Sequence, residues 1–226
     1  METNALLLLS GGIDSPVAGF LAKEKKYLLN AIHFSQEPFT DNTPELKSLA
    51  SAKKLGIKEL IIIDCGKELQ EIAEKTFNEY YFVLMKIFFM TVSEKIANQK
   101  KINFLITGES LGQVSSQTMS NLQTINSRVE IEILRPCFFM EKQEIVDISI
   151  REGFFEISKG PEQCDALALG RPKTKTNIDK VLIELEKCNM HELVKRALKK
   201  IRIIKTEKIN INKIIKENQS KTICEK

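Results

Sequence analysis

Residues 5–16 read Ala-Leu-Leu-Leu-Leu-Ser-Gly-Gly-Ile-Asp-Ser-Pro, an apolar run that passes through a glycine-rich segment to a proline. The run Ala5–Leu9 is typical of a strand buried on both faces. Pro16 stands where a first helical turn would begin. Apolar residues then continue with helical spacing at Val17, Ala18, Phe20 and Leu21. The stretch therefore predicts a strand, a glycine-rich loop and a helix, in that order.

The loop at residues 10–15 has the chemistry of an anion site. Glycines let the backbone approach a phosphate closely, and the N–H groups at a helix N-terminus attract negative charge. No Gly-Lys-Ser/Thr follows, so the loop is not of the Walker type. The simpler alternative is a tight turn between strand and helix, capped by Asp14.

Short apolar strands alternate with helical patterns over the next 140 residues. Further strands are predicted over 28–34, 60–64, 104–107 and 129–134, and helices over 46–55, 68–98 (with a break near Asn78) and 142–152. The alternation predicts an α/β fold with a central parallel sheet of about five strands, covered on both faces. Ligands of such sheets bind beyond the carboxyl ends of the strands. That rule places residues 10–15, 33–34, 65 and 108–117 along one edge.

The chain changes character after residue 170. No strand is predicted there; helices are predicted over 178–189 and 192–201, and the last 15 residues are expected to fray. Residues 171–226 carry 16 Lys and Arg against 7 Asp and Glu, a net charge of +9, whereas residues 1–170 carry 18 against 23, a net charge of −5. A basic tail on an acidic body suggests contact with a polyanion. A solvated helix face and a docking surface for a partner protein remain equally open. The spacing of the tail cations could place several of them on one helical face; they are Lys195, Arg196, Lys199, Lys200, Arg202 and Lys205.

Composition excludes several classes of protein. With 226 residues, 42% of them hydrophobic and 28% charged, the chain suits one globular α/β domain with a small appendage. No apolar stretch approaches the roughly 20 residues of a membrane span, and no export signal is visible. The five cysteines form neither a CxxC nor a Cys/His cluster, which argues against a disulfide framework or a zinc site. We expect a cytoplasmic protein that does not contact membranes.

The SGGxDS pattern at 10–15 resembles the PP-loop of ATP pyrophosphatases, which cleave ATP between the α- and β-phosphates. Further segments resemble one branch of that class, the ThiI family of tRNA 4-thiouridine synthetases, also tied to thiamine sulfur supply. They are residues 8–18, 32–34, 107–118 (Thr-Gly-Glu-Ser-Leu-Gly-Gln-Val-Ser-Ser-Gln-Thr), 134–136, 141–145, 157–158 and 161–164 (Pro-Glu-Gln-Cys). The resemblance implies a HUP-type sandwich over residues 1–176, followed by a basic helical extension over 177–226.

The resemblance also assigns residues to an ATP site. Ser10 and Ser15 would donate to the pyrophosphate, and Asp14 would orient the loop or help to hold Mg²⁺. The full implied set of nucleotide contacts is Leu8, Leu9, Ser10, Gly11, Gly12, Asp14, Ser15, His33, Phe34, Lys86, Gly108 and Gln117. His33 taken alone would read more simply as a satisfied buried histidine. No metal-ligand cluster is visible, so Mg²⁺ is implied by the chemistry alone.

Cys164 matches the catalytic-domain cysteine of the family and would act beside Asp14. A thiolate attacks sulfur readily, so Cys164 would carry or resolve a persulfide. Cys65 is expected in the core. Cys188 would be a resolving partner only if the tail folds back, and Cys137 and Cys224 have no motif support.

The sequence departs from the family in three ways. No stretch resembles the THUMP region that holds tRNA, none resembles a rhodanese domain, and no CxxC stands near Lys86, where bacterial relatives have an arginine. The implied partners are therefore tRNA, held directly or through a separate RNA-binding subunit, and a sulfur donor such as a cysteine desulfurase or a rhodanese-like protein. A homodimer is compatible with the sequence.

The expected reaction is adenylation of a uridine carbonyl, with release of pyrophosphate, followed by attack of sulfur and release of AMP. Two other functions stay open at this point. One is an adenylating sulfurtransferase or ligase acting on a small molecule, for example in thiamine-linked sulfur metabolism. The other is a non-catalytic ATP-binding subunit of a complex.

Overall fold

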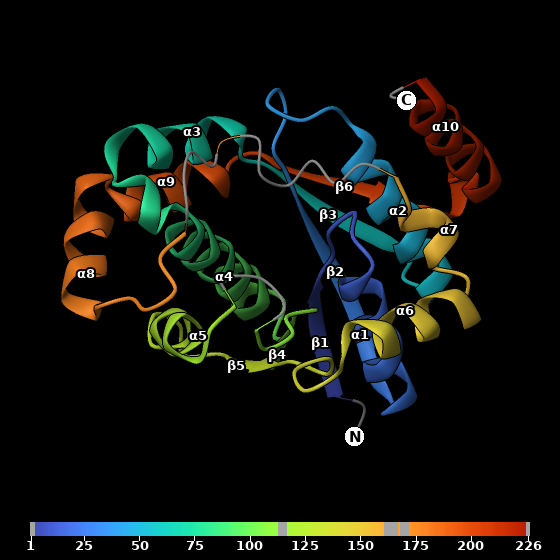
Figure 1. Cartoon of the computed structure of the whole chain (residues 1–226), viewed down its shortest axis with the longest axis horizontal. Helices are drawn as coiled ribbons and strands as arrows, with labels where there is room; N and C mark the ends of the chain where they lie inside the picture. The colour runs from blue at the N-terminus through green and yellow to red at the C-terminus, as the bar shows by residue number, and fades with distance from the viewer. Residues whose placement is uncertain (1–2, 113–116, 161–166, 168–171, 225–226) are drawn as a thin grey trace.

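The computed structural model describes residues 3–112, 117–160, 167 and 172–224, with side chains described as far as residue 217. Six strands form one sheet in the order β5-β4-β1-β2-β3-β6 (Figure 1). They are β1 (Thr3–Leu8), β2 (Tyr27–Ser35), β3 (Glu59–Asp64), β4 (Phe104–Ile106), β5 (Glu132–Leu134) and β6 (Ile201–Lys205). The first five run parallel, as predicted, and β6 is antiparallel to β3.

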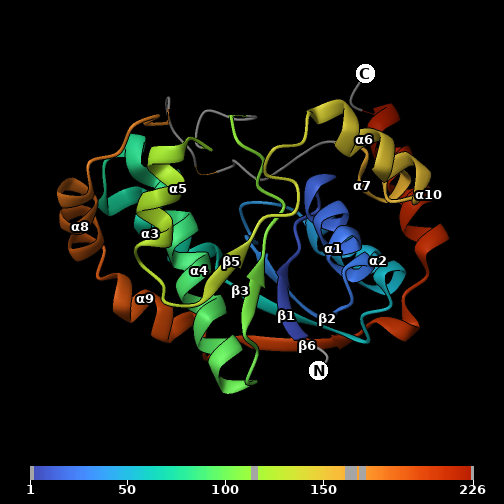
Figure 2. The same ribbon diagram turned by 90° about the horizontal axis from the view of Figure 1, so that it is seen from below.

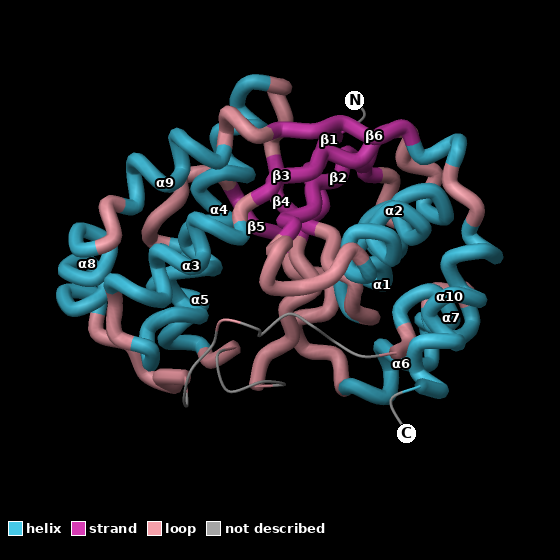
Figure 3. Tube along the Cα trace, turned by 90° about the horizontal axis from the view of Figure 1, so that it is seen from above, coloured by secondary structure: helices cyan, strands magenta, loops and turns pink. Residues whose placement is uncertain are grey.

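Helices cover both faces of the sheet (Figures 2 and 3). One group is α1 (Asp14–Glu24), α2 (Thr43–Leu55), α6 (Lys142–Arg151), α7 (Phe155–Ser158) and α10 (Ile211–Cys224). The other is α3 (Gly66–Lys75), α4 (Tyr81–Gln99), α5 (Met119–Asn126), α8 (Ile178–Lys187) and α9 (Met190–Ala197). Short 3-10 turns lie at Asn78–Tyr80, where the predicted break falls, and at Thr206–Lys208.

The two faces are built by alternate residues of the same strands. Leu6 of β1 packs into the core beneath α3, α4, α8 and α9, whereas Ala5 and Leu7 pack beneath α1, α2 and α6. Leu6 and Leu7 are fully buried, and each buried leucine contributes about 1.5–3 kcal/mol to folding. This two-sided burial is why the central strands read as uninterrupted apolar runs.

The tail departs from the sequence-based expectation. Residues 201–205 form strand β6, although no strand was predicted after residue 170, and the helix predicted over 192–201 is observed as Met190–Ala197. The last residues form α10, which packs through Ile214 against Ala50 of α2 and Ile157 of α7. The tail thus completes both the sheet and one helical layer. Its division from the body at residue 176 stays a prediction.

The six tail cations do not share one helical face. They are spread over α9, the turn after it and β6, and three of them form ion pairs with the body. Arg202 binds both carboxylate oxygens of Asp64, at 2.6 and 2.8 Å, and Glu45 Oε2 at 2.7 Å. These contacts attach β6 to the end of β3 and the start of α2. Carboxylates of the body therefore neutralise three of the six tail cations.

Candidate active site

The loop of residues 10–13 connects the central strand β1 to α1. The backbone N–H of Ser10 donates to Ser15 Oγ at 2.9 Å, and the two serine hydroxyls lie 3.1 Å apart. The N–H of Gly12 donates to Ser10 Oγ at 3.3 Å. Within the described part of the chain, the N–H groups of Gly11 and Ile13 have no hydrogen-bond partner. The serines therefore hold the loop in a closed turn that leaves donors available to an anion at the N-terminus of α1.

Helices α2 and α7 support this loop from the side. A Cβ placed on Gly11 would lie 2.9 Å from Pro44 Cα, so the loop backbone lies directly against the first turn of α2. Ser158 at the end of α7 donates through its hydroxyl to the carbonyl of Gly12 at 3.2 Å. Buried Lys47 in turn donates to the carbonyl of Ser158 at 3.1 Å.

Gly108 follows β4 and lies against the start of α1. A Cβ added to it would lie 2.6 Å from both the carbonyl carbon of Asp14 and the backbone nitrogen of Ser15. Real side chains do not tolerate such an approach to backbone, so only glycine fits here. Three predicted site residues, Gly108 and the distant Asp14 and Ser15, are thus brought together.

Replacing Gly108 with alanine should therefore displace the loop. We expect the affinity for ATP to fall by about 100-fold, because displaced loop donors would lose hydrogen bonds to the phosphates, and a hydrogen bond to a charged group contributes about 1.5–3 kcal/mol. Titration calorimetry with a non-hydrolysable ATP analogue measures it. Gly112→Ala is the control: its added methyl would meet no atom of the described residues within 4 Å, although its φ of +73° carries a strain cost. Equal ATP affinity in wild type and Gly108→Ala would contradict the placement of the nucleotide at this loop.

Asp14 is the first residue of α1, and its Oδ1 accepts a hydrogen bond from Lys142 Nζ at 2.7 Å. Lys142 opens α6, which is held by a capping box between Glu141 and Glu144. Lys142 lies in residues 141–145, one of the segments that resemble the ThiI family, but the sequence predicts no role for it. Because 128 positions separate it from Asp14, only the fold reveals the pair.

His33 and Phe34 lie on β2 beside the end of β1. Nδ1 of His33 lies 2.9 Å from the carbonyl oxygen of Leu9 and 3.0 Å from Ser48 Oγ. A carbonyl only accepts, so Nδ1 carries the proton and Nε2 is left as an acceptor. Burial lowers the pKa of His33, against the opposing effect of the Leu9 hydrogen bond, so the ring is neutral at pH 7. His33 therefore holds Leu9, the residue that directly precedes the loop. Its neighbour Phe34 stacks on Phe89 of α4, with ring centroids 4.2 Å apart.

Lys86 belongs to a buried ionic group that sequence reasoning did not foresee. The carboxylate of Glu109, only 3% exposed, lies 3.3 Å from Lys86 Nζ and 2.8 Å from Arg135 Nε. It also accepts from Thr107 Oγ1 at 3.1 Å. Burial alone would raise the pKa of Glu109, but the charges of Lys86 and Arg135 and the hydrogen bonds from Arg135 and Thr107 lower it. Glu109 is thus ionised and fixes two cations next to Gly108.

Glu109→Gln should destabilise the fold, because it leaves Lys86 and Arg135 without their counter-charge. We expect a loss of about 3 kcal/mol at pH 7, measured by urea unfolding. The control, Glu74→Gln, removes an exposed carboxylate that bonds only to Gln70 in the described structure, and should change stability by less than about 0.5 kcal/mol. Equal stability of Glu109→Gln and wild type would show that the carboxylate is not ionised.

The same variant gives a pH test. A carboxyl whose pKa is lowered on folding contributes stability above its unfolded pKa, near 4.5, and the contribution disappears as the pH falls through the folded pKa. The stability difference between wild type and Glu109→Gln should therefore shrink as the pH falls below about 4.5. A difference that grows on acidification would contradict the assigned direction.

The remaining predicted contacts lie close by. Gln117 Oε1 accepts from the backbone N–H of Ser110 at 3.0 Å, and its carbonyl accepts from Gly112 at 2.9 Å, which closes the segment after Gly108. Leu8 is half-buried and Leu9 is 3% exposed at the end of β1. The predicted residues that are described thus gather at the carboxyl ends of β1, β2 and β4. Their roles toward ATP stay predictions.

The cysteines separate into two groups. Cys164 lies outside the described residues, whereas Cys65, Cys137 and Cys188 are free, fully buried thiols. Burial raises the pKa of Cys137 to about 12 and that of Cys188 to about 11. It also raises the pKa of Cys65, which lies in the core as expected. These three thiols are protonated at neutral pH, and none of them is a ready nucleophile.

The described residues also bear on two other possibilities, a metal-ligand group and a membrane-spanning helix. Among them, no group of three or more His, Cys, Asp or Glu side chains is placed to hold a metal ion. No described helix combines the length and apolar character needed to cross a membrane.

The structure places the SGGxDS pattern of residues 10–15 between the central strand β1 and α1, and this pattern in this position identifies an α/β protein of the PP-loop class. A match to a known family narrows this class to one family. The family model described as thiamine biosynthesis protein (ThiI) matches residues 1–190. The chain therefore belongs to the ThiI family.

Named relatives support the same family. A probable tRNA sulfurtransferase of Oceanobacillus iheyensis is 42% identical over 184 residues, which cover 78% of this chain and 46% of that protein. One of Alkaliphilus oremlandii is 37% identical over 213 residues, covering 92% and 54%. The chain thus spans about half the length of the curated relatives it matches.

Solved structures show the same fold. The crystal structure of a 4-thiouridine synthetase–RNA complex with bound ATP superposes with a TM-score of 0.82 and 31% identity, covering 89% of this chain and 55% of that one. The NMN synthetase of Francisella tularensis, at 17% identity and a TM-score of 0.52, shares the fold alone.

Proposed function

We propose that this chain catalyses ATP-dependent sulfur transfer to a uridine of tRNA. The observation that carries the proposal is the Ser10–Ser15 loop, closed by its serines and packed against Gly108, in a chain of the ThiI family. The solved relative with bound ATP and RNA supports both substrates. The implied site residues, including Cys164, are part of this proposal.

The first step is adenylation. The uridine carbonyl oxygen attacks the α-phosphorus of ATP, the bond to the bridging oxygen breaks, and pyrophosphate leaves. The N–H groups of Gly11 and Ile13, which have no partner among the residues that the structure describes, and the hydroxyls of Ser10 and Ser15 would stabilise the charge that develops on the pyrophosphate. The Lys86–Glu109–Arg135 group has a net charge of +1 and supplies further positive charge at the same edge of the sheet.

The second step is sulfur transfer. Cys164 would carry or resolve a persulfide, whose outer sulfur attacks the activated carbon while AMP leaves with the oxygen. A second thiolate then attacks the inner sulfur, the S–S bond breaks, and thiouridine is released. The second thiolate would belong to the donor protein if Cys164 carries the persulfide, or to Cys164 if the donor carries it, and the disulfide that remains is reduced by an external thiol. The sulfur donor would be a cysteine desulfurase or a rhodanese-like protein, and tRNA would be held by this chain, by a separate subunit or by a homodimer.

Mg²⁺ would neutralise the phosphates of the bound nucleotide. The residues fit this ion in part, since Mg²⁺ commonly takes one carboxylate and completes its shell with phosphate oxygens and water. Asp14 supplies that carboxylate at the N-terminus of α1. We also propose a cytoplasmic location, because the three described cysteines are free thiols.

The decisive experiment measures pyrophosphate and AMP release by this chain with ATP and different acceptors. A tRNA transcript should stimulate release and become thiolated when sulfide is supplied. The family description as a thiamine biosynthesis protein favours one alternative, a small-molecule acceptor. Release stimulated by a small molecule and not by tRNA would support that alternative. ATP binding without release under any condition would indicate a non-catalytic subunit.

A further inference from the structure

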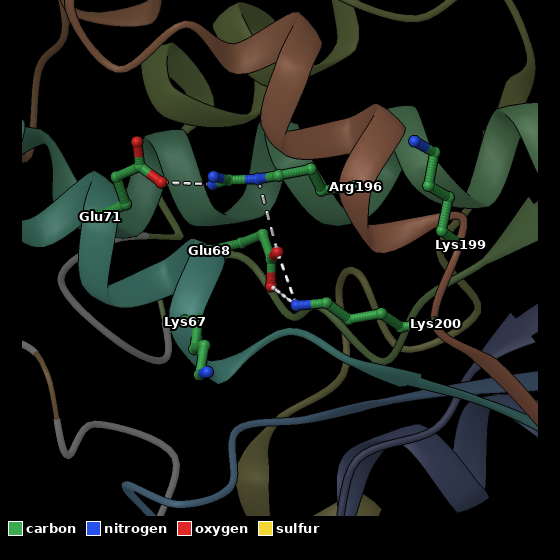
Figure 4. A pocket seen from close by; sticks show the side chains of 6 residues that line it. All are labelled: Lys67, Glu68, Glu71, Arg196, Lys199 and Lys200. Carbon is green, nitrogen blue, oxygen red and sulfur yellow. Dashed lines mark hydrogen bonds and ion pairs between the residues drawn. The ribbon is translucent and has the colours of Figure 1, made fainter.

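A hollow of about 460 Å³ lies between α3 and α9, on the face of the sheet opposite α1 (Figure 4). Its lining side chains are all charged: Lys67, Glu68, Glu71, Arg196, Lys199 and Lys200. Four are cationic and two are acidic, so the hollow has a net charge of +2. None of these residues belongs to the site around the Ser10–Ser15 loop.

Ion pairs fix the centre of the hollow. Glu68 is 1% exposed, and its two oxygens accept from Lys200 Nζ at 2.8 and 3.0 Å. Arg196 binds Glu71 through its guanidinium, and that hydrogen bond raises the pKa of Arg196. Both carboxylates are therefore neutralised by cations of the tail, and the arrangement is held in place before any ligand arrives.

Two cations are left over. Lys67 and Lys199 are exposed, and their ammonium groups have no partner within the described structure. Figure 4 shows them on opposite sides of the ion-paired centre, with neither directed at a carboxylate. The unused positive charge of the hollow is thus carried by these two lysines.

The hollow lies at the edge of the sheet where the predicted active site lies. Lys67 is in the first turn of α3, which begins directly after the carboxyl end of β3. Lys199 and Lys200 precede β6, whose Ile201 pairs with Ile63 near that same end. A polyanion that reaches the loop after β1 can therefore continue along this edge toward α3.

The chemistry of the lining indicates the kind of ligand. Lysine ammonium groups bind phosphates as point charges. Among the residues described, no aromatic side chain lines the hollow, so none is available for a base to stack on. The groups that the lining leaves without a partner within the described residues are two ammonium ions, which suit a phosphate better than the charge-depleted centre of a protein interface. We propose that Lys67 and Lys199 each bind one backbone phosphate of the RNA substrate, away from the reacting base. This inference rests on the proposed function for the identity of the RNA.

The test is the binding of an unmodified tRNA transcript to the full chain as a function of salt. In Lys67→Gln/Lys199→Gln we expect affinity to fall by about 10-fold at 50 mM salt. The slope of log affinity against log salt should become shallower by about 2, since each lost phosphate contact removes about 1. Neither substitution breaks a contact within the described structure, so the thermal unfolding midpoint should not change.

The matched control is Lys95→Gln/Lys100→Gln. Both lysines are exposed, have no partner within the described structure and lie toward the carboxyl end of α4, near the opposite edge of the sheet (Figure 2). This variant has the same net charge but should retain the wild-type slope. Equal weakening in both variants would overturn the proposal, because only net charge would then matter.

Other outcomes also overturn it. One is an unchanged salt slope of tRNA binding in Lys67→Gln/Lys199→Gln. Another is a wild-type protein that does not bind the transcript even at low salt. A third is a variant that still binds RNA but is no longer activated by a sulfur-donor protein. The last would assign the hollow to a protein. ATP consumption and thiolation by wild type are measured separately, so failure of the phosphate site is distinguished from failure of the proposed function.

Discussion

Replacing Asp14 with alanine is expected to reduce pyrophosphate release from ATP by about 100-fold to 1000-fold, the range found when one preorganised charged or polar group is removed. Asp14 is the acidic side chain at the N-terminus of α1, next to the loop that would hold the pyrophosphate. The fold should survive. The ion pair with Lys142 is between partly exposed side chains, and such pairs contribute at most about 1 kcal/mol.

Lys142→Ala is the matched control for Asp14→Ala. It breaks the same ion pair but keeps the carboxylate, so pyrophosphate release should fall by less than about 10-fold. Both variants are compared with wild type by a coupled pyrophosphate assay and by thermal unfolding. Near wild-type release in Asp14→Ala would remove Asp14 from the catalytic machinery. Equal losses in the two variants would mean that the ion pair, rather than the carboxylate, is what the reaction needs.

Replacing Cys164 with serine should abolish sulfur transfer from a persulfide donor while ATP binding persists. A serine hydroxyl stays protonated at neutral pH and neither attacks nor carries sulfur as a thiolate does. We expect thiolated tRNA to fall by at least about 1000-fold when a persulfide donor supplies the sulfur, and the ATP affinity to change by less than about twofold. Free sulfide attacks the activated carbon without the cysteine, so thiolation with sulfide should persist and serves as the control for adenylation.

Cys188→Ser provides the comparison. Cys188 is fully buried among the residues beneath α8 and α9, and burial raises its pKa to about 11. Its thiol donates to the carbonyl of Leu185 at 3.4 Å, a bond that a hydroxyl can also make. Sulfur transfer should therefore persist in this variant. Thiolation at the wild-type rate by Cys164→Ser with the persulfide donor would leave that cysteine without a chemical role, and loss of thiolation in Cys188→Ser would identify Cys188 as the resolving partner.

The body of the fold could be predicted because its signals are local. The Ala5–Leu9 run, the glycines after it and Pro16 specify strand, loop and helix within 12 residues, and β3 is a β-branched run of the same kind. Strand β6 could not be predicted in this way. Its side chains are mostly exposed, so little apolar burial is encoded in it. Its place follows from pairing with β3 and from the contacts of Arg202 with Asp64 and Glu45.

The site divides in the same manner. The loop and Gly108 belong to motifs that can be read directly from the sequence, and the structure brings them into contact. The Lys86–Glu109–Arg135 group depends on side chains that approach one another only in the folded chain, from positions 23 and 26 residues apart. The sequence does place Glu109 directly after the motif residue Gly108, which was a signal for a functional carboxylate. Its cationic partners could not be found from the sequence, because no fixed spacing relates them to Glu109.

Strand β6 also protects the sheet. Without it, the backbone N–H and C=O groups of Leu60–Ile63 would lie unpaired at the edge of the sheet, along a strand whose side chains are apolar. Such an edge recruits strands from other molecules. A chain cut before Ile201 would therefore tend to aggregate through β3, whatever its affinity for RNA. Point substitutions such as Lys67→Gln/Lys199→Gln leave that edge covered, so they separate ligand binding from self-association where a truncation would not.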